Sequence, residues 1–170
     1  MITVGVDCDG VTSLPRMLTL LMLTRRNERV FWWLQKFRFL QRLYNYFFRI
    51  ANPEIREFMK ELKEQGFGVV IISASNESYR QELTRWHLEN GFCFNELYLK
   101  QTPDEDNLAY KKRMTSCCVY YFDDNLEIVN YINNGIDGNS GCLAFLYQGQ
   151  KKEELLDFYL SPIFKIFKTV

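Results

Sequence analysis

Histidine is nearly absent from this chain, because His87 is the single one among its 170 residues. Hydrolases built on a Ser-His-Asp or Cys-His group need a histidine beside the nucleophile, and His87 belongs to no such grouping. We expect it to be structural. A surplus of charge of one sign is also missing, since 21 basic residues balance 21 acidic ones. A neutral chain has no general attraction to nucleic acid, which leaves a local basic patch as the route to such binding.

Long hydrophobic runs and regular cysteine spacings are absent too. No apolar stretch reaches the roughly 18 residues that span a bilayer, and Met1 leads directly into a predicted strand without a signal-peptide pattern. The cysteines lack zinc-type spacing, are odd in number and include an adjacent pair, which favours free buried thiols in a reducing cytosol. We therefore expect a cytoplasmic protein without a transmembrane segment. The five cysteines are Cys8, Cys93, Cys117, Cys118 and Cys142.

Apolar residues are abundant, at 47% of the chain with 16% aromatic, so the sequence predicts a folded protein. Its length fits a single domain, residues 1–170. Five short apolar runs recur, and most are continuous rather than alternating, as expected for strands buried on both faces of a parallel sheet. The predicted strands are Ile2–Asp7, Gly68–Ser73, Glu96–Lys100, Cys118–Asp123 and Cys142–Tyr147.

Helical patterns separate these runs. The stretch Pro53–Gln65 ends at Gly66, a common helix stop, and similar patterns cover Ser78–Asn90 and Leu126–Asn134. Strand and helix in alternation predict an α/β fold with a doubly wound five-stranded parallel sheet and right-handed crossovers. Ligands of such sheets bind beyond the carboxyl ends of the strands.

Residues 12–52 interrupt this alternation, and the segment RVFWWLQKFRFLQRLYNYFFRI within them is both aromatic and basic. We expect a small helical cap-like insertion over the active-site end. Its apolar stripe is Trp33, Phe37, Leu40, Tyr44 and Phe47, and its polar stripe is Gln35, Arg38, Arg42, Asn45 and Arg49. Such a stripe is typical of packing on the protein's own core. A homodimer face, single-stranded nucleic-acid binding and peripheral contact with a membrane are the alternatives.

Two acidic clusters follow apolar runs. Asp7 and Asp9 stand in VGVDCDGV, and Asp123 and Asp124 stand in VYYFDDN. Residues i and i+2 of an extended segment project to the same side, so each cluster can approach a shared ligand. Carboxylates held close together repel one another, and a divalent cation is the usual remedy. The two clusters predict a magnesium-dependent active site.

Together these motifs resemble those of the haloacid dehalogenase-like (HAD) hydrolases, and the resemblance covers nearly the whole chain except the insertion. The first motif is VGVDCDGV, the second is VVIISAS with Ser73 at the motif position, and the fourth is VYYFDDN. The third motif is a lysine, for which Lys111 is our choice and Lys112 and Lys100 are the alternatives. The resemblance implies a Rossmann-like core and phosphatase activity.

The resemblance also implies roles for the acids. Asp7 would attack phosphorus and form an aspartyl-phosphate. Asp9 would protonate the leaving oxygen and then activate water; a second acid at this position is typical of phosphatases rather than dehalogenases. The ligands of Mg²⁺ would be Asp7, the backbone carbonyl of Asp9, and Asp123 or Asp124.

Phosphate would be held, by the same resemblance, by Ser73 and the following backbone amides, including that of Ala74, near a helix N-terminus. Lys111 would offset charge on the phosphoryl group. The stretch RQELTRWHLENGFCFNELYLK resembles part of the phosphatases that act on nucleotides and polynucleotide ends, which implies a phosphorylated nucleotide or nucleic-acid end as the substrate. A lipid-linked or small-metabolite phosphate and a non-catalytic binding or dimerisation module on the same fold are the alternatives.

Overall fold

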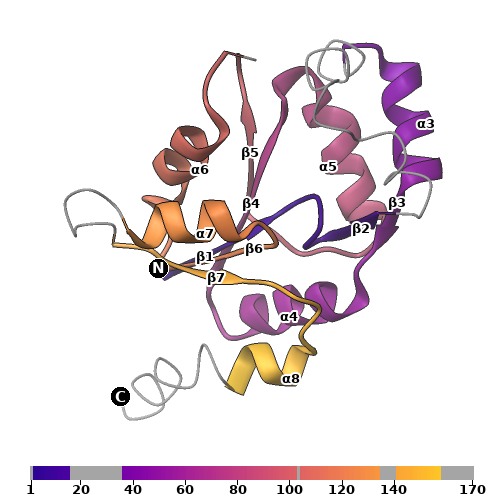
Figure 1. Cartoon of the computed structure of the whole chain (residues 1–170). Coiled ribbons are helices and arrows are strands. Elements are labelled where there is room, and N and C mark those ends of the chain that lie inside the picture. Colours follow the sequence, from indigo (N-terminus) through magenta and orange to yellow (C-terminus); the bar gives the residue numbers. More distant parts are fainter. Residues whose placement is uncertain (1, 16–35, 103, 135–140, 158–170) are drawn as a thin grey trace.

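The computed structural model describes residues 2–15, 36–102, 104–134 and 141–157, which form a sheet with helices on both faces (Figure 1). The described part contains a five-stranded sheet of order β5-β4-β1-β6-β7, and each neighbouring pair is parallel. Each predicted run overlaps one strand, so the predicted α/β fold with its five-stranded parallel sheet is confirmed. The strands are β1 (Thr3–Asp7), β4 (Gly68–Asn76), β5 (Glu96–Lys100), β6 (Tyr120–Asp123) and β7 (Leu143–Leu146).

The crossover helices begin and end where local chemistry dictates. In α4 (Pro53–Glu64), the Asn52 side chain accepts a hydrogen bond from the backbone amide of Glu54 at 3.2 Å, and Pro53 stands at the first position, where no amide hydrogen is needed. The chain leaves α4 through Gly66, whose φ of +84° suits glycine. The other helices after it are η2 (Glu77–Tyr79), α5 (Arg80–Glu89), α6 (Asn107–Thr115), α7 (Leu126–Asn133) and α8 (Lys152–Leu155).

Two hydrophobic clusters cover the two faces of the sheet. One joins alternate residues of β1 and β4 to α4, α5 and α8, and includes Val6, Ile71 and Phe58. The other joins the opposite residues of β4 and β6 to α6 and α7, and includes Ile72 and Ile132. Since side chains alternate across a strand, continuous apolar runs supply both clusters. This double burial fixes the central strands, whose ends carry the acids.

The segment 12–52 includes elements that the sequence pattern did not predict. The strands β2 (Ser13–Pro15) and β3 (Arg49–Ala51) pair antiparallel at its two ends, with Ser13 opposite Ala51. Between them, α3 (Arg38–Phe48) packs beside α5, as Figure 1 shows. Residues 16–35, with Trp33 and Gln35 of the predicted stripes, lie outside the described residues.

The orientation of α3 matches the predicted one only in part. Arg38 and Arg42 of the polar stripe are exposed as expected, and Tyr44 of the apolar stripe packs against the core. Asn45 of the polar stripe, however, is buried, and Phe47 of the apolar stripe is 49% exposed.

The polar residues Gln41 and Asn45 of α3 are 2% and 7% exposed, whereas Phe39 and Tyr46 are 71% and 74% exposed. The buried side meets polar groups: Asn45 donates to the backbone oxygen of Glu82 at 3.3 Å and accepts from the Tyr79 hydroxyl. Polar side chains can be buried when they are hydrogen-bonded, and here the neighbouring helix supplies the partners.

The prediction of free, buried cysteine thiols is confirmed in part. All five cysteines are free, but Cys93 and Cys117 are exposed, so the prediction of buried thiols is wrong for these two. Among the described helices, none combines the length and apolar character needed to cross a bilayer.

His87 packs inside the fold, as expected for a structural histidine. Its Nδ1 lies 2.9 Å from the backbone oxygen of Leu83 and its Nε2 lies 3.0 Å from Oγ1 of Thr12. In a neutral ring Nδ1–H donates to the Leu83 carbonyl, and Nε2 then faces the Thr12 hydroxyl as the unprotonated nitrogen. Burial lowers the pKa of His87 from 6.5 to about 3.

The first prediction follows from this pKa. The unfolded chain binds a proton at His87 below pH 6.5 and the folded protein does not until about pH 3, so this group lowers the free energy of unfolding as pH falls through that window. Because the chain has one histidine, its ring signal in NMR needs no assignment. It should not titrate between pH 8 and 5 in the folded protein, and should titrate near its ordinary pKa in urea. A folded-state midpoint near 6.5 would contradict the buried neutral ring.

Candidate active site

The acidic residues meet at one edge of the sheet because the central strands run parallel. Asp7 ends β1 and Asp123 ends β6, and β1 lies between β4 and β6. Asp7 lies opposite Ile72 of β4 in the strand register, so Ser73 follows at the same edge. The carboxyl ends of parallel strands are where such sheets bind ligands.

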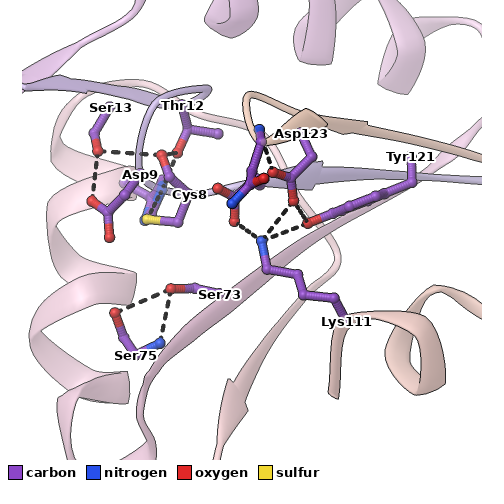
Figure 2. A network of polar contacts seen from close by, with 12 residues as sticks. Cys8, Asp9, Thr12, Ser13, Ser73, Ser75, Lys111, Tyr121 and Asp123 are labelled. Atoms are coloured by element: carbon purple, nitrogen blue, oxygen red, sulfur yellow. Dashed lines mark hydrogen bonds and ion pairs between the residues drawn. The ribbon is translucent and has the colours of Figure 1, made fainter. Parts of the chain in front are cut away.

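Lys111 joins the two acids. From α6, its Nζ contacts Oδ1 of Asp7. The same Nζ lies 2.9 Å from Oδ2 of Asp123 (Figure 2). All three side chains are buried, with exposed fractions of 3% for Lys111 and 9% and 1% for the two acids. The three groups lie on different elements and are brought together by the crossover from β5 to β6.

The alternative lysines lie elsewhere. Lys112 is the next residue of α6 and its Nζ lies 5.3 Å from the centre of the Tyr131 ring. Lys100 ends β5 and donates to Oδ1 of Asn107 at 2.7 Å. The geometry therefore favours Lys111 as the lysine of the site.

Tyr121 is a member of the site that the sequence reasoning missed. Its hydroxyl accepts from Lys111 at 2.7 Å and donates to Oδ2 of Asp123 at 2.7 Å. Tyr121 and Asp123 are two residues apart on β6 and so project to the same side of the sheet. That spacing was available in the sequence, but a tyrosine within an aromatic run gives no separate signal of a polar role.

The charges at this edge do not balance. Three carboxylates, from Asp7, Asp123 and Asp124, face one ammonium group, which leaves two formal negative charges. Burial raises the pKa of Asp7, and Lys111 opposes this rise. Burial and the neighbouring Asp123 raise the pKa of Asp124 to about 6. The ionised site thus lacks positive charge, and a divalent cation would supply it.

The donor set fits Mg²⁺. One carboxylate oxygen from each of Asp7, Asp123 and Asp124 can be chosen so that all lie within 4.8 Å of one another, and oxygen is the donor that Mg²⁺ prefers. Gly10 makes room for this cluster: its φ is +95°, and a Cβ there would lie 2.0 Å from Oδ2 of Asp124. Asp123 already accepts from Lys111, Tyr121 and the amide of Asn125, so Asp124 is the less occupied of the adjacent pair.

Asp9 occupies a different environment from Asp7. Its side chain is 49% exposed and pairs with Arg49 at 2.8 Å, and the Ser13 hydroxyl donates to it at 3.0 Å. Figure 2 shows the Asp9 carboxylate turned toward Ser13 and away from Lys111. The predicted place of Arg49 on an exposed polar stripe is wrong, because its side chain is 1% exposed. Burial disfavours its charge, but Asp9 and other neighbours keep the pKa of Arg49 above its usual value.

Ser73 lies at the expected edge but on a strand that is longer than predicted. β4 continues to Asn76, with an irregular register against β5 between Ser73 and Asn76. The Ser73 hydroxyl lies 3.1 Å from that of Ser75 and accepts from the Ser75 amide at 3.2 Å, apart from the Lys111 group in Figure 2. The 3₁₀ turn η2 separates Ala74 from α5, so the helix N-terminus is further from Ser73 than the pattern predicted.

This fold is a known one, since the solved structures that resemble the chain include HAD-superfamily proteins. A chain of the Pnkp1/Rnl/Hen1 complex matches with a TM-score of 0.59 and 18% identity, over 85% of this chain and 45% of that one. The HAD domain of effector protein Lem4 from Legionella pneumophila matches with 0.55 and 16%, over 99% and 94%. D,D-heptose 1.7-bisphosphate phosphatase from B. bronchiseptica, complexed with magnesium and phosphate, matches with 0.52 and 12%, over 92% and 86%.

At these identities the likeness shows the fold: the chain has the HAD fold. The chain spans less than half of the length of its match in the Pnkp1/Rnl/Hen1 complex. No protein-family model matches the sequence, and no curated protein sequence matches it.

The second prediction is that Mg²⁺ stabilises the folded protein through Asp124. With a Kd of about 1 mM, about 10 mM Mg²⁺ stabilises by about 1.4 kcal/mol, which raises Tm by about 3 to 6 °C. Asp124→Asn should abolish most of this rise, measured by thermal unfolding with and without chelator. Asp104→Asn removes the same charge from an exposed position and should keep the full rise. Equal rises in the two variants would contradict a site at Asp124.

Proposed function

We propose that the protein is a Mg²⁺-dependent phosphatase that hydrolyses a phosphomonoester through an aspartyl-phosphate. The observation that carries the proposal is the cluster of Asp7, Asp123 and Asp124 around Lys111 at the carboxyl edge of the sheet. Bound to Asp7, Asp123, Asp124 and the backbone carbonyl of Asp9, Mg²⁺ would offset the negative charge shared by nucleophile and phosphate.

In the proposed first half-reaction, an oxygen of Asp7 attacks phosphorus and the bond to the leaving oxygen breaks. The leaving oxygen takes a proton from Asp9. In the second, Asp9 accepts a proton from water, the water oxygen attacks phosphorus, and the Asp7 carboxylate is released with inorganic phosphate. Lys111 stabilises charge on Asp7 and the phosphoryl oxygens. Ser73 and the backbone amide of Ala74 are proposed to hold the other phosphoryl oxygens.

The proposed assignment explains why the two acids have different surroundings. A nucleophile must be ionised and held still, and Asp7 is buried against a lysine. A group that exchanges protons with a leaving group and with water must reach solvent, and Asp9 is half exposed. Environments that differ in this way let two carboxylates of one site perform two tasks.

For the substrate, we propose a phosphorylated nucleotide or polynucleotide end. The support is the pattern in Arg80–Lys100 together with the similarity to a chain of an RNA repair complex. Arg42 of α3 adds an exposed positive charge beside this segment. Its side chain is 58% exposed and pairs with the buried Glu82 at 3.2 Å.

The third prediction tests the reaction. Purified protein should hydrolyse p-nitrophenyl phosphate in the presence of Mg²⁺, and chelator should remove the activity. Asp7→Asn should reduce the rate by roughly 10⁴-fold, because loss of a nucleophile removes the covalent route. The variant should fold, since Lys111 keeps Asp123 and Tyr121 as partners. Asp104→Asn is the matched control. Chelator-resistant activity, or wild-type activity in Asp7→Asn, would overturn the proposal.

The fourth prediction concerns Asp9. Asp9→Asn should reduce the rate on an alkyl phosphate by roughly 10²- to 10⁴-fold and on p-nitrophenyl phosphate by less than about tenfold, because a good leaving group needs little protonation. Burst kinetics would separate this effect from slow hydrolysis of the aspartyl-phosphate. The variant should also have a lower Tm, since it leaves the buried Arg49 without a carboxylate. Equal losses on both substrates in the first half-reaction would rule out Asp9 as the acid.

A further inference from the structure

The carboxylate of Asp9 is held on two sides by the short sheet of β2 and β3. Nη2 of Arg49, on β3, lies 2.8 Å from Oδ1 and 3.0 Å from Oδ2. The hydroxyl of Ser13, on β2, donates to Oδ1 at 3.0 Å. A half-exposed aspartate is ordinarily free to change rotamer, and these contacts favour the orientation that it has here.

Arg49 is itself immobilised. Its Nη1 donates to Sγ of Cys8 at 3.0 Å. Its guanidinium carbon lies 5.3, 5.5 and 5.6 Å from the ring centres of Tyr44, Tyr79 and Trp86. Arginine stacks well on aromatic faces and gains cation–π energy there. The cation is thus fixed in position before it meets Asp9.

The burial of Arg49 separates two roles it could have. Its side chain is 1% exposed, so it cannot bind a substrate that enters from solvent. A buried guanidinium needs a negative partner, and among the ion pairs of the described residues Asp9 is the one that meets this need. The Arg49 guanidinium therefore lies in the protein interior, whereas the Asp9 carboxylate is half exposed.

We propose that Arg49 is a positioning residue, which through its ion pair orients the Asp9 carboxylate for proton transfer at the active site. The proposal rests on the proposed phosphatase function. It gives residues 12–52 a part in catalysis through the β2–β3 pair, because both donors to Asp9 lie on those strands. Removal of Arg49 should therefore affect the step that needs Asp9 and leave phosphoryl transfer to Asp7 otherwise intact.

The experiment compares kcat and KM on p-nitrophenyl phosphate and glycerol 2-phosphate, with Mg²⁺, for a set of variants. Arg49→Met should reduce kcat on glycerol 2-phosphate by roughly 10- to 100-fold, as expected when a catalytic group is misplaced. Its kcat on p-nitrophenyl phosphate should fall less than about threefold, and KM should stay within about twofold for both, since Arg49 does not touch substrate. Arg49→Lys should recover part of the loss.

A double variant separates positioning from a general structural role. In an Asp9→Asn background, Arg49→Met should cause no further selective loss, because both changes remove the same function. Arg56→Met is the matched control, since it removes an exposed ion pair with Glu57 on α4, and should leave the ratio of the two rates unchanged. If Arg49→Met does not fold, Arg49→Lys and Ser13→Ala remain informative, and each should lower the ratio by a smaller factor.

The outcomes distinguish this inference from the proposed function. Equal losses on both substrates, or a further selective loss in the Asp9→Asn background, would overturn the positioning role. The phosphatase proposal would still hold in that case, because the wild-type protein would be active. An inactive wild-type protein, or an active Asp7→Asn variant, would instead overturn the phosphatase proposal and this inference with it.

Discussion

The contact of Lys111 with Asp7 and Asp123 is the constraint on which the site depends. Two buried carboxylates end neighbouring strands of the sheet, and without a cation between them both could not be ionised. The lysine reaches them from α6, and Tyr121 fills the remaining space with a hydroxyl that both accepts and donates. The crossover between β5 and β6 must therefore place α6 against this edge, and the buried Tyr110 and Ile132 in the adjoining core hold it there. One ammonium group against three carboxylates leaves a net negative charge, which Mg²⁺ would neutralise.

Asp7 and Asp9 lie close together at the end of β1 but have different environments. Asp7 ends a central strand and is buried, whereas Asp9 lies two residues later, beyond the sheet, and is half exposed. Gly10 turns the chain sharply there, and the amide of Ser13 donates to the backbone oxygen of Cys8 at 2.8 Å. Each acid has its own cation, Lys111 for the first and Arg49 for the second. Lys111 comes from α6, which packs in one core cluster, whereas Arg49 contacts Tyr79 and Trp86 of the other. The two environments can therefore differ although the two acids are near neighbours in sequence.

The helix α3 illustrates where a local pattern is informative and where it is not. Its amphipathic spacing predicted a helix with two unlike faces, and the helix exists. The pattern did not determine which face is buried, because that depends on the surface it meets. Here α5 offers the buried Glu82 and η2 offers the hydroxyl of Tyr79, so Asn45 and Gln41 face inward. Phe39, Tyr46 and Phe47 face outward. Packing overrides a preference that is weak on its own.

The sequence by itself determined the elements and the acids. Continuous apolar runs predicted five buried strands, glycines predicted where helices stop, and the acids after the first and fourth runs predicted a site at one edge, because each of these signals is local. The tertiary structure alone decided the pairings. Lys111 lies 104 residues from Asp7, and Arg49 lies 41 residues from Cys8 and 40 from Asp9. No periodicity links residues so far apart, and an arginine on an amphipathic helix looks exposed until the fold encloses it in aromatic rings. Contacts between distant segments are set by how whole elements pack, and that information is not present in any window of the chain.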